Sequence, residues 1–216
     1  MTPITLLAEQ AKRDSYEAFR PQMEQAMLFQ EKRRNRVYAM NRAIGNDIKN
    51  GLYVEFGVAQ GAGSKLFGKL LKPHGLSMTG FDSFEGLEED WTGIQTGRAA
   101  GAFSTGGKLP KVPSNVTLVK GMVQDTLPGY LKDTGKAPFA FVHMDMDTYT
   151  PTAFVLNAIK KRLTKGTVIL FDELYGYPGW RYHEHKALEE TLDPASYQFV
   201  SFAKEEVAIE MLATPK

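Results

Sequence analysis

The chain has 216 residues, 43% of them hydrophobic, which suits one globular domain with a substantial core. It contains 26 lysine and arginine residues against 25 aspartate and glutamate residues, so no excess of charge predicts binding to nucleic acid or to a membrane surface. The absence of cysteine excludes disulfides and thiolate chemistry and is compatible with a cytoplasmic protein.

Residues 1–50 are expected to form a helical extension, and residues 51–216 to form the main domain. Residues 1–30 have a weak helical pattern that Pro21 interrupts, and we interpret them as a lid or as a contact in a homo-oligomer. They lack the basic-then-apolar order of a signal peptide, and no apolar run reaches the length of a membrane span. The sequence therefore predicts no membrane partner.

A firmer helix is predicted after residue 30, and Asn50-Gly51 would end it. Its apolar stripe consists of Val37, Met40, Ile44 and Ile48. The charged run from Lys32 to Arg36 is interpreted as a solvated face of this helix instead of a binding patch, because charge runs usually face water.

The stretch from Tyr53 to Ser64 predicts a strand that ends in a glycine turn and continues into a helix. Glycines let the backbone turn sharply and approach a ligand, and the N–H groups that open the helix favour a carboxylate or a phosphate. The run resembles the first motif of class I S-adenosylmethionine (SAM) methyltransferases, with Ala59 in place of the usual middle glycine. A ligand-free α/β protein could use the same turn. The small residues alternate as Glu55-x-Gly57-x-Ala59-x-Gly61-x-Gly63, unlike the G-x-G-x-x-G of dinucleotide enzymes.

Strands and helices then alternate, which predicts an α/β fold with a Rossmann-like, mostly parallel sheet and helices on both faces. Strands are expected at residues 76–81, 116–120, 137–144 and 167–171. Helices are expected at residues 127–133, 151–163 and 183–192. Residues 197–202 and 207–212 predict a terminal antiparallel hairpin that turns near Lys204-Glu205.

Residues 83–115 contain too many glycines and prolines for a regular core element. A connection of this length in a compact domain is usually functional or disordered. Trp91, Ile94 and Phe103 could anchor it, so we interpret it as a partly ordered flap over an acceptor pocket. A flexible insertion without a role is the alternative.

Acidic residues follow the predicted strands. Because ligands of such sheets bind beyond the carboxyl ends of the strands, these residues mark a candidate site. Asp82 could accept hydrogen bonds from a ribose diol, although a solvated loop aspartate is the simpler interpretation. Glu55 lies inside an apolar strand and needs partners, such as backbone amides or the ammonium of an amino-acid ligand.

A second acidic group consists of Asp145, Asp147, Asp172 and Glu173. If three of these carboxylates converged without a cation, repulsion would force at least one to take a proton. A divalent metal removes that conflict, and oxygen ligands favour Mg²⁺, with Mn²⁺ and Ca²⁺ as alternatives. Strand-end acids that simply face water are the competing interpretation.

Several ordered runs resemble known enzyme families. Residues 121–128 (GMVQDTLP), 142–145 (VHMD) and 165–173 (KGTVILFDE) resemble the metal-dependent O-methyltransferases of the catechol type. Residues 81–86 (FDSFEG) and 143–149 (HMDMDTY) are closer still to the macrocin O-methyltransferase family, which methylates sugar hydroxyls on natural products.

The resemblance covers about residues 50–190 and implies a class I methyltransferase fold, SAM as cofactor and a divalent cation, with Mg²⁺ favoured. The acceptor would be a hydroxyl of a small molecule, either a sugar or a polyhydroxylated natural product. The implied metal ligands are Asp145, Asp172 and Glu173. Asp82 would hold the ribose, and Gln124 would lie beside the adenine. The implied cofactor site is completed by Glu55, Gly57, Gly61, Gly63, Ser64 and Asp125.

The chain departs from the catechol-type pattern at the catalytic base, because Thr148 stands where those enzymes carry a lysine. Glu173 also replaces an amide-bearing residue. Asp147 is the first candidate for the base, and Asp145 could share that role. His143 is interpreted as a core histidine, while the aromatic residues between 175 and 182 could either line an acceptor pocket or pack under a loop.

Two other function classes stay open at this point. An NAD(P)-binding oxidoreductase is disfavoured by the glycine spacing and by the carboxylate group. A catalytically silent SAM-binding protein would carry the same cofactor motifs. The oxidoreductase would differ from an O-methyltransferase in binding NAD(P) instead of SAM. The silent protein would bind SAM but transfer no methyl group.

Overall fold

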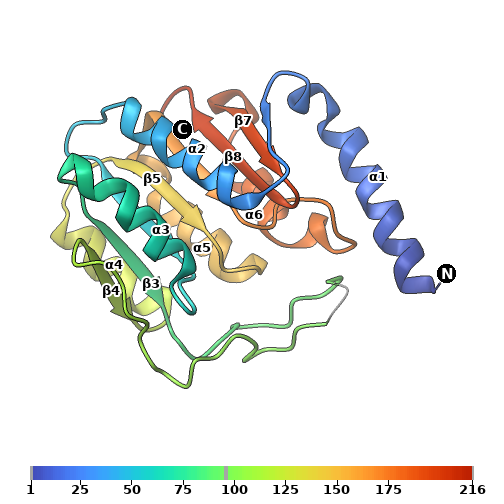
Figure 1. Cartoon of the computed structure of the whole chain (residues 1–216), viewed down its shortest axis with the longest axis horizontal. Helices are drawn as coiled ribbons and strands as arrows, with labels where there is room; N and C mark the ends of the chain where they lie inside the picture. Colours follow the sequence, from blue (N-terminus) through green and yellow to red (C-terminus); the bar gives the residue numbers. More distant parts are fainter. Residues whose placement is uncertain (1, 95–96, 216) are drawn as a thin grey trace.

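The computed structural model describes residues 2–94 and 97–215, and residues 1, 95, 96 and 216 lie outside the described part. Within it, the strands form one sheet in the order β1-β7-β8-β6-β5-β2-β3-β4 (Figure 1). The strands are β1 (Met27–Leu28), β2 (Leu52–Phe56), β3 (Met78–Asp82), β4 (Val116–Lys120), β5 (Phe139–Met144), β6 (Leu163–Phe171), β7 (Tyr197–Ala203) and β8 (Glu206–Met211).

Helices cover both faces of this sheet. Helices α2 and α3 pack on one face, α4, α5 and α6 pack on the other, and α1 lies beside β7 (Figure 1). The α-helices are α1 (Pro3–Met23), α2 (Lys32–Gly45), α3 (Ala62–Leu71), α4 (Val123–Asp133), α5 (Tyr149–Ile159) and α6 (Glu184–Thr191). Short 3₁₀ segments lie at Lys72–His74, Lys160–Arg162, Trp180–Tyr182 and Pro194–Ser196.

The strand directions confirm the predicted fold class. Strands β6, β5, β2, β3 and β4 run parallel, whereas β8 is antiparallel to both β6 and β7. The predicted terminal hairpin is therefore present, and its turn lies at Lys204 and Glu205. The fold is a Rossmann-like α/β sheet, mostly parallel, with helices on both faces.

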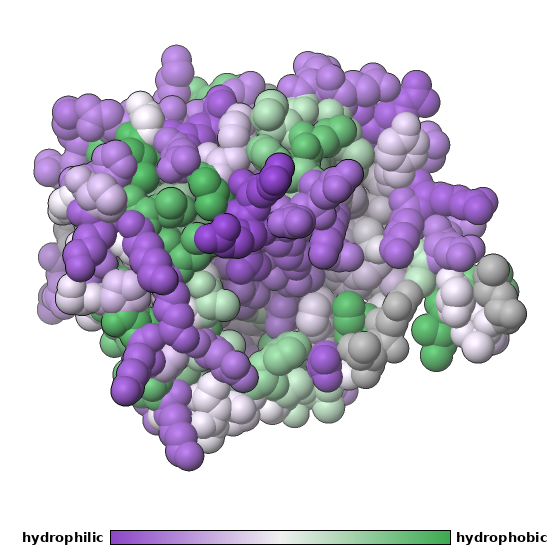
Figure 2. Space-filling model, viewed as in Figure 1, coloured by the Kyte–Doolittle hydropathy of each residue, from purple (hydrophilic) through white to green (hydrophobic). Residues whose placement is uncertain are grey.

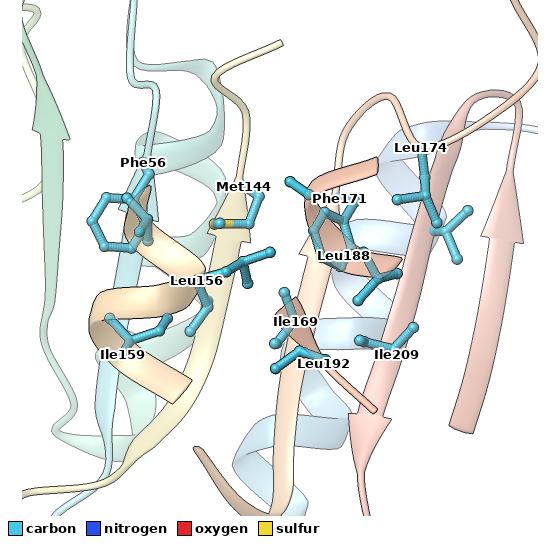
Figure 3. Packing of buried hydrophobic residues seen from close by; sticks show 14 of the residues in the cluster. Phe56, Met144, Leu156, Ile159, Ile169, Phe171, Leu174, Leu188, Leu192 and Ile209 are labelled. Carbon is cyan, nitrogen blue, oxygen red and sulfur yellow. The ribbon is translucent and has the colours of Figure 1, made fainter. Parts of the chain in front are cut away.

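The pleat of the central strands distributes side chains between the two faces, because successive residues of a strand point in opposite directions. Figure 3 shows Phe56, Met144 and Phe171 on the face that α5 and α6 cover, close to Leu156 and Leu188. The neighbouring positions on β2, β5 and β6 point towards α2 and α3 instead. This alternation decides which acidic residues meet α2.

Several predicted elements differ from the structure at their ends. Helix α2 ends at Gly45, before Ile48 of the predicted stripe, and buries Ala39, Met40 and Ala43. Helix α1 continues through Pro21 to Met23, although Pro21 has no N–H to donate to the preceding turn. Strand β1, which pairs with β7, is two residues long and has no pattern that the sequence could reveal. The proposed division of the chain at residue 50 stays a prediction.

Among the residues that the structure describes, each helix is too short or too polar to span a lipid bilayer.

Helix α1 is held to the sheet chiefly by one aromatic side chain. Its buried residues recur every three or four positions and end at Phe19, which is 5% exposed. The Phe19 ring lies 5.5 to 6.0 Å from the ring centroids of Tyr175, Trp180, His185, Phe199 and Phe202. This cluster joins α1 to β7 and α6.

We predict that Phe19→Ala lowers the free energy of unfolding by about 3 kcal/mol, because the change leaves a cavity among five aromatic rings. Urea denaturation followed by circular dichroism measures this loss. Glu9→Ala on the same helix is the control, and it should change the stability by less than about 0.5 kcal/mol, since Glu9 is exposed. Equal effects of the two substitutions would show that the aromatic cluster does not hold α1.

The same cluster predicts a pH dependence of stability. Burial lowers the pKa of His185 from 6.5 to about 4, and the nearby Glu189 carboxylate is too exposed to offset that effect. The unfolded chain therefore binds a proton more readily than the folded chain between pH 6.5 and pH 4.

We expect the free energy of unfolding to fall by up to about 3 kcal/mol as the pH drops from 6.5 to 4. His185→Gln should flatten this part of the profile, whereas His74→Gln, at an exposed position, should leave it intact. Urea titrations at several pH values measure the profile, and an unchanged slope in His185→Gln contradicts the assignment.

Candidate active site

A cavity of about 310 Å³ lies beyond the carboxyl ends of β2, β3, β4, β5 and β6. Its lining includes residues from each of these strand ends and from the segment that follows β3. The sequence-predicted residues that line it are Gly57, Asp82, Gln124, Asp145, Asp147, Asp172 and Glu173. The predicted residues that do not line it are Glu55, Gly61, Gly63, Ser64 and Asp125.

The glycine turn after β2 closes tightly on the end of β5. Gly57 has a φ of +88°, and a Cβ atom there would lie 1.7 Å from the carbonyl oxygen of Asp145. Only glycine fits this position without moving the backbone. The turn and the first acid of the second group are therefore in direct backbone contact.

Asp82 organises the same turn from the end of β3. One carboxylate oxygen accepts hydrogen bonds from the backbone N–H groups of Val58 and Ala59, both at 2.7 Å. The other oxygen accepts one from the N–H of Phe84 at 2.6 Å. A carboxylate has about four acceptor positions, so Asp82 keeps capacity for a hydroxyl on the cavity side.

Glu55 is buried on the face of the sheet that α3 covers and binds within the protein. It accepts a hydrogen bond from the Ser64 hydroxyl, and its Oε1 lies 3.0 Å from Nδ1 of His143. A Cβ atom at Gly63 would lie 1.9 Å from the same Oε1. The partners that a buried carboxylate requires are thus supplied by side chains of the protein itself.

His143 lies between two carboxylates. Its Nε2 is 3.8 Å from Oδ1 of Asp172, too far for a hydrogen bond but close enough for charge attraction. Burial lowers the pKa of His143, but the carboxylates of Asp172 and Glu55 outweigh it and raise the pKa to about 10. His143 is therefore a buried cation at neutral pH.

Helix α2 supplies two further cations, and the prediction of a fully solvated face is wrong for them. Nζ of Lys32 lies 2.9 Å from Oδ2 of Asp172 and 2.7 Å from Oε1 of Glu173. Arg36 pairs with Asp172 and, at 2.7 Å, with the buried Glu206 of β8. Hydrophilic residues gather at the centre of the face in Figure 2, where α2 begins in Figure 1.

Three cavity carboxylates lie close together. Asp145, Asp147 and Glu173 each have an oxygen within 4.8 Å of the others. Burial, together with the neighbouring charge of Asp172, raises the pKa of Asp145 and of Glu173, and burial raises that of Asp147 to about 7. Oε2 of Glu173 is buried and has no partner among the described residues. Lys32 pairs with Glu173 at 2.7 Å, and no described residue forms an ion pair with Asp145 or Asp147.

A divalent cation fits this group. The donors are all carboxylate oxygens, which suits Mg²⁺, and two positive charges would offset the repulsion that raises their pKa values. Asp172 fits less well than the sequence implied, because Lys32 and Arg36 occupy its two oxygens. The better set is Asp145, Asp147 and Glu173, of which Asp147 was not among the implied ligands.

The segment after β3 forms part of the cavity wall. Its two ends are described and residues 95 and 96 lie outside the described part. Trp91 and Phe103 line the cavity, and Trp91 is only 6% exposed. The backbone oxygen of Thr92 lies 2.9 Å from Nε2 of His183, which ties the segment to the start of α6.

The structure also places Gln124 and the aromatic residues between 175 and 182. Gln124, the predicted neighbour of an adenine, donates a hydrogen bond to Glu88 at 2.7 Å across the cavity mouth. The aromatic residues that could have lined an acceptor pocket do not line this cavity. Tyr175, Tyr177 and Trp180 pack in the core, whereas Tyr182 is 67% exposed.

Comparison with known proteins identifies the domain type. Residues 54–174 match the model of a family described as a methyltransferase domain. A search of curated protein sequences finds no significant match. Among solved structures, the apo form of CalS11, described as a TDP-rhamnose 3′-O-methyltransferase of calicheamicin biosynthesis, is 25% identical, with 81% of this chain and 78% of that chain covered and a TM-score of 0.59.

Two further structures share the fold. Another CalS11 structure, described as a calicheamicin methyltransferase, is 24% identical and covers 81% of this chain and 77% of its own, with a TM-score of 0.64. The O-methyltransferase NovP is 19% identical and covers 83% and 79% respectively, also with a TM-score of 0.64. At this identity the similarity concerns the arrangement of the sheet and its helices.

The contact between Gly63 and Glu55 leads to a matched prediction. Gly63→Ala should lower the free energy of unfolding by about 1 to 3 kcal/mol, because its methyl group overlaps the buried carboxylate. Gly129→Ala, in helix α4 with no atom within 4 Å of the new Cβ, should raise it by about 0.5 to 1 kcal/mol. Thermal unfolding compares the two variants, and a stabilised Gly63→Ala contradicts the packing described.

Proposed function

The chain belongs to the methyltransferase domain family, and on that premise we propose that it transfers a methyl group from SAM to a hydroxyl of a small molecule, with the help of a divalent cation. The observation that carries the proposal is that Gly57 of the glycine turn and the carboxylates of Asp145 and Asp147 line the same cavity. The methyl donor would then lie beside the cation that binds the acceptor hydroxyl.

The cofactor would bind on the β2, β3 and β4 side of the cavity. Asp82 retains acceptor capacity for the ribose hydroxyls, as acidic residues do at this position in nucleotide-binding sheets. Gln124 and Met122 line the cavity beyond β4, where the adenine would lie. Glu55 and Ser64 would act indirectly, by holding the start of α3 beneath the turn.

Asp145, Asp147 and Glu173 would hold the cation, Mg²⁺ in the first instance. When bound, the cation supplies positive charge that lowers the pKa of an acceptor hydroxyl and fixes its oxygen in the cavity. Asp145 would bring this charge close to the glycine turn, because its backbone contacts Gly57.

Asp147 is the candidate general base, and Asp145 could share the role. Asp147 lines the cavity in which the acceptor hydroxyl would bind, and burial raises its pKa to about 7 before a cation binds. In the transfer, the acceptor oxygen forms a bond to the methyl carbon while the carbon–sulfur bond breaks. The electron pair remains on sulfur, which yields S-adenosylhomocysteine, and the hydroxyl proton passes to the Asp147 carboxylate.

A sugar or another polyhydroxylated compound is the proposed acceptor. CalS11, which is described as acting on TDP-rhamnose, supports this class by similarity. Trp91 and Phe103 support it as well, since they offer apolar ring faces at the cavity wall. The exposed Ile4, Leu6 and Leu7 of α1 support a homo-oligomer that buries this helix.

The decisive assay measures methyl transfer from labelled SAM to a panel of sugars and polyols, with Mg²⁺ and with EDTA. We expect EDTA and Asp145→Asn each to reduce the rate by about 100-fold or more, because both remove the charge that activates the acceptor. Asp133→Asn, at an exposed position in α4, is the matched control and should leave the rate unchanged.

Each alternative has its own outcome in this assay. Full activity of Asp145→Asn in EDTA would remove the cation from the mechanism. Calorimetric binding of SAM without transfer to any acceptor would identify a silent SAM-binding protein, and binding of NADH in place of SAM would identify an oxidoreductase. SAM affinity in Asp145→Asn should stay close to that of the unmodified protein.

A further inference from the structure

We infer that Lys32 is a positioning residue that acts as an internal counter-ion in the acidic group, where it competes with a divalent cation for Asp172 and Glu173. The inference rests on the cation site of the proposed function and adds a residue that the sequence pattern had placed in solvent. Lys32 is the first residue of α2 and lies far in sequence from the carboxylates that it contacts.

The contacts of Lys32 resemble those of a bound cation. Its Nζ lies 2.9 Å from the carbonyl oxygen of Asp172, 2.9 Å from Oδ2 of Asp172 and 2.7 Å from Oε1 of Glu173. The side chain is 23% exposed, and those of Asp172 and Glu173 are 9% and 14% exposed. Solvent therefore screens these ion pairs less than it screens surface pairs.

Local helix structure does not explain the position of Lys32. A positive charge in the first turn of a helix is unfavourable, because the positive end of the helix dipole lies there. Lys32 is the first residue of α2, and Glu31 at the N-cap makes no side-chain capping hydrogen bond. The carboxylates beyond β6 thus stabilise a charge that the helix itself disfavours.

Arg36 also binds Asp172, so that the oxygens of Asp172 are held by α2 while one oxygen of Glu173 is not. It lies one helical turn after Lys32 and pairs with the second oxygen of Asp172 and with Glu206. Asp172 consequently has both oxygens bound to α2. Glu173 has one oxygen bound to Lys32, and its other oxygen is buried without a partner among the described residues. Lys32 therefore leaves one oxygen of Glu173 for the cavity.

Lys32 is not a replacement for the lysine base of catechol-type enzymes. It does not line the cavity, and two carboxylates stabilise its charged form, which raises its pKa above the ordinary value despite burial. A lysine that keeps its proton contributes positive charge alone. The effect of Lys32 is therefore electrostatic. Its ammonium repels a divalent cation that binds the other oxygen of Glu173.

The test measures Mn²⁺ affinity by electron paramagnetic resonance on the full-length chain. Lys32→Met removes the ammonium, and we expect it to bind Mn²⁺ at least about tenfold more tightly than the unmodified protein. Lys32→Arg keeps the charge and should retain the original affinity. Arg33→Met removes a charge from an exposed position of the same helix and is the control for net charge. Lys32→Gln replaces Lys32→Met if circular dichroism shows that the latter is unfolded.

The outcomes separate this inference from the proposed cation site. Tighter binding by Lys32→Met, with Lys32→Arg and Arg33→Met unchanged, supports the inference, even if the unmodified protein binds no Mn²⁺ and the proposed metal dependence fails. Equal or weaker binding by Lys32→Met overturns the inference, and the cation site is then judged on the unmodified protein. Tighter binding by Lys32→Arg or by Arg33→Met also overturns it, because the effect would not depend on the ammonium.

Discussion

Burying carboxylates requires positive charge close by, and this requirement shapes the centre of the molecule. The chain meets it for Glu55, Asp172 and Glu206 with His143 and with the two cations of α2. The chain meets this requirement only in part for the cavity acids, because Lys32 pairs with Glu173 while Asp145 and Asp147 have no ion pair among the described residues. The first group stabilises the contact between α2 and the sheet, and the second lines the cavity of the proposed active site.

The two groups meet at the end of β6. This strand ends at Phe171, and the consecutive acids Asp172 and Glu173 follow it. Both acids line the cavity, but Lys32 and Arg36 bind the two oxygens of Asp172, whereas Glu173 keeps one oxygen without a partner among the described residues. One pair of adjacent acids thereby serves both the packing of a helix and the proposed active site, and Lys32 contacts both members.

The sequence predicts the sheet well because its strands are continuous apolar runs, and Val116–Lys120 agrees with the structure at both ends. It predicts the cavity because acids that follow parallel strands must meet at one edge. It fails for Lys32, since a charged run gives no sign of which members face a buried carboxylate 140 residues away. It also cannot show that Glu55 is satisfied by Ser64 and His143, because that pairing depends on the register of β2 and β5.

The central claim is that the cavity acids hold a cation beside the methyl donor while α2 retains Asp172. Anomalous diffraction from crystals grown with S-adenosylhomocysteine and Mn²⁺ tests this claim most directly. We expect one manganese peak about 2.1 Å from oxygens of Asp145, Asp147 and Glu173, with the ion pair between Lys32 and Asp172 intact. A peak coordinated by Asp172 in place of Lys32, or no peak beside the cofactor sulfur, would contradict the account.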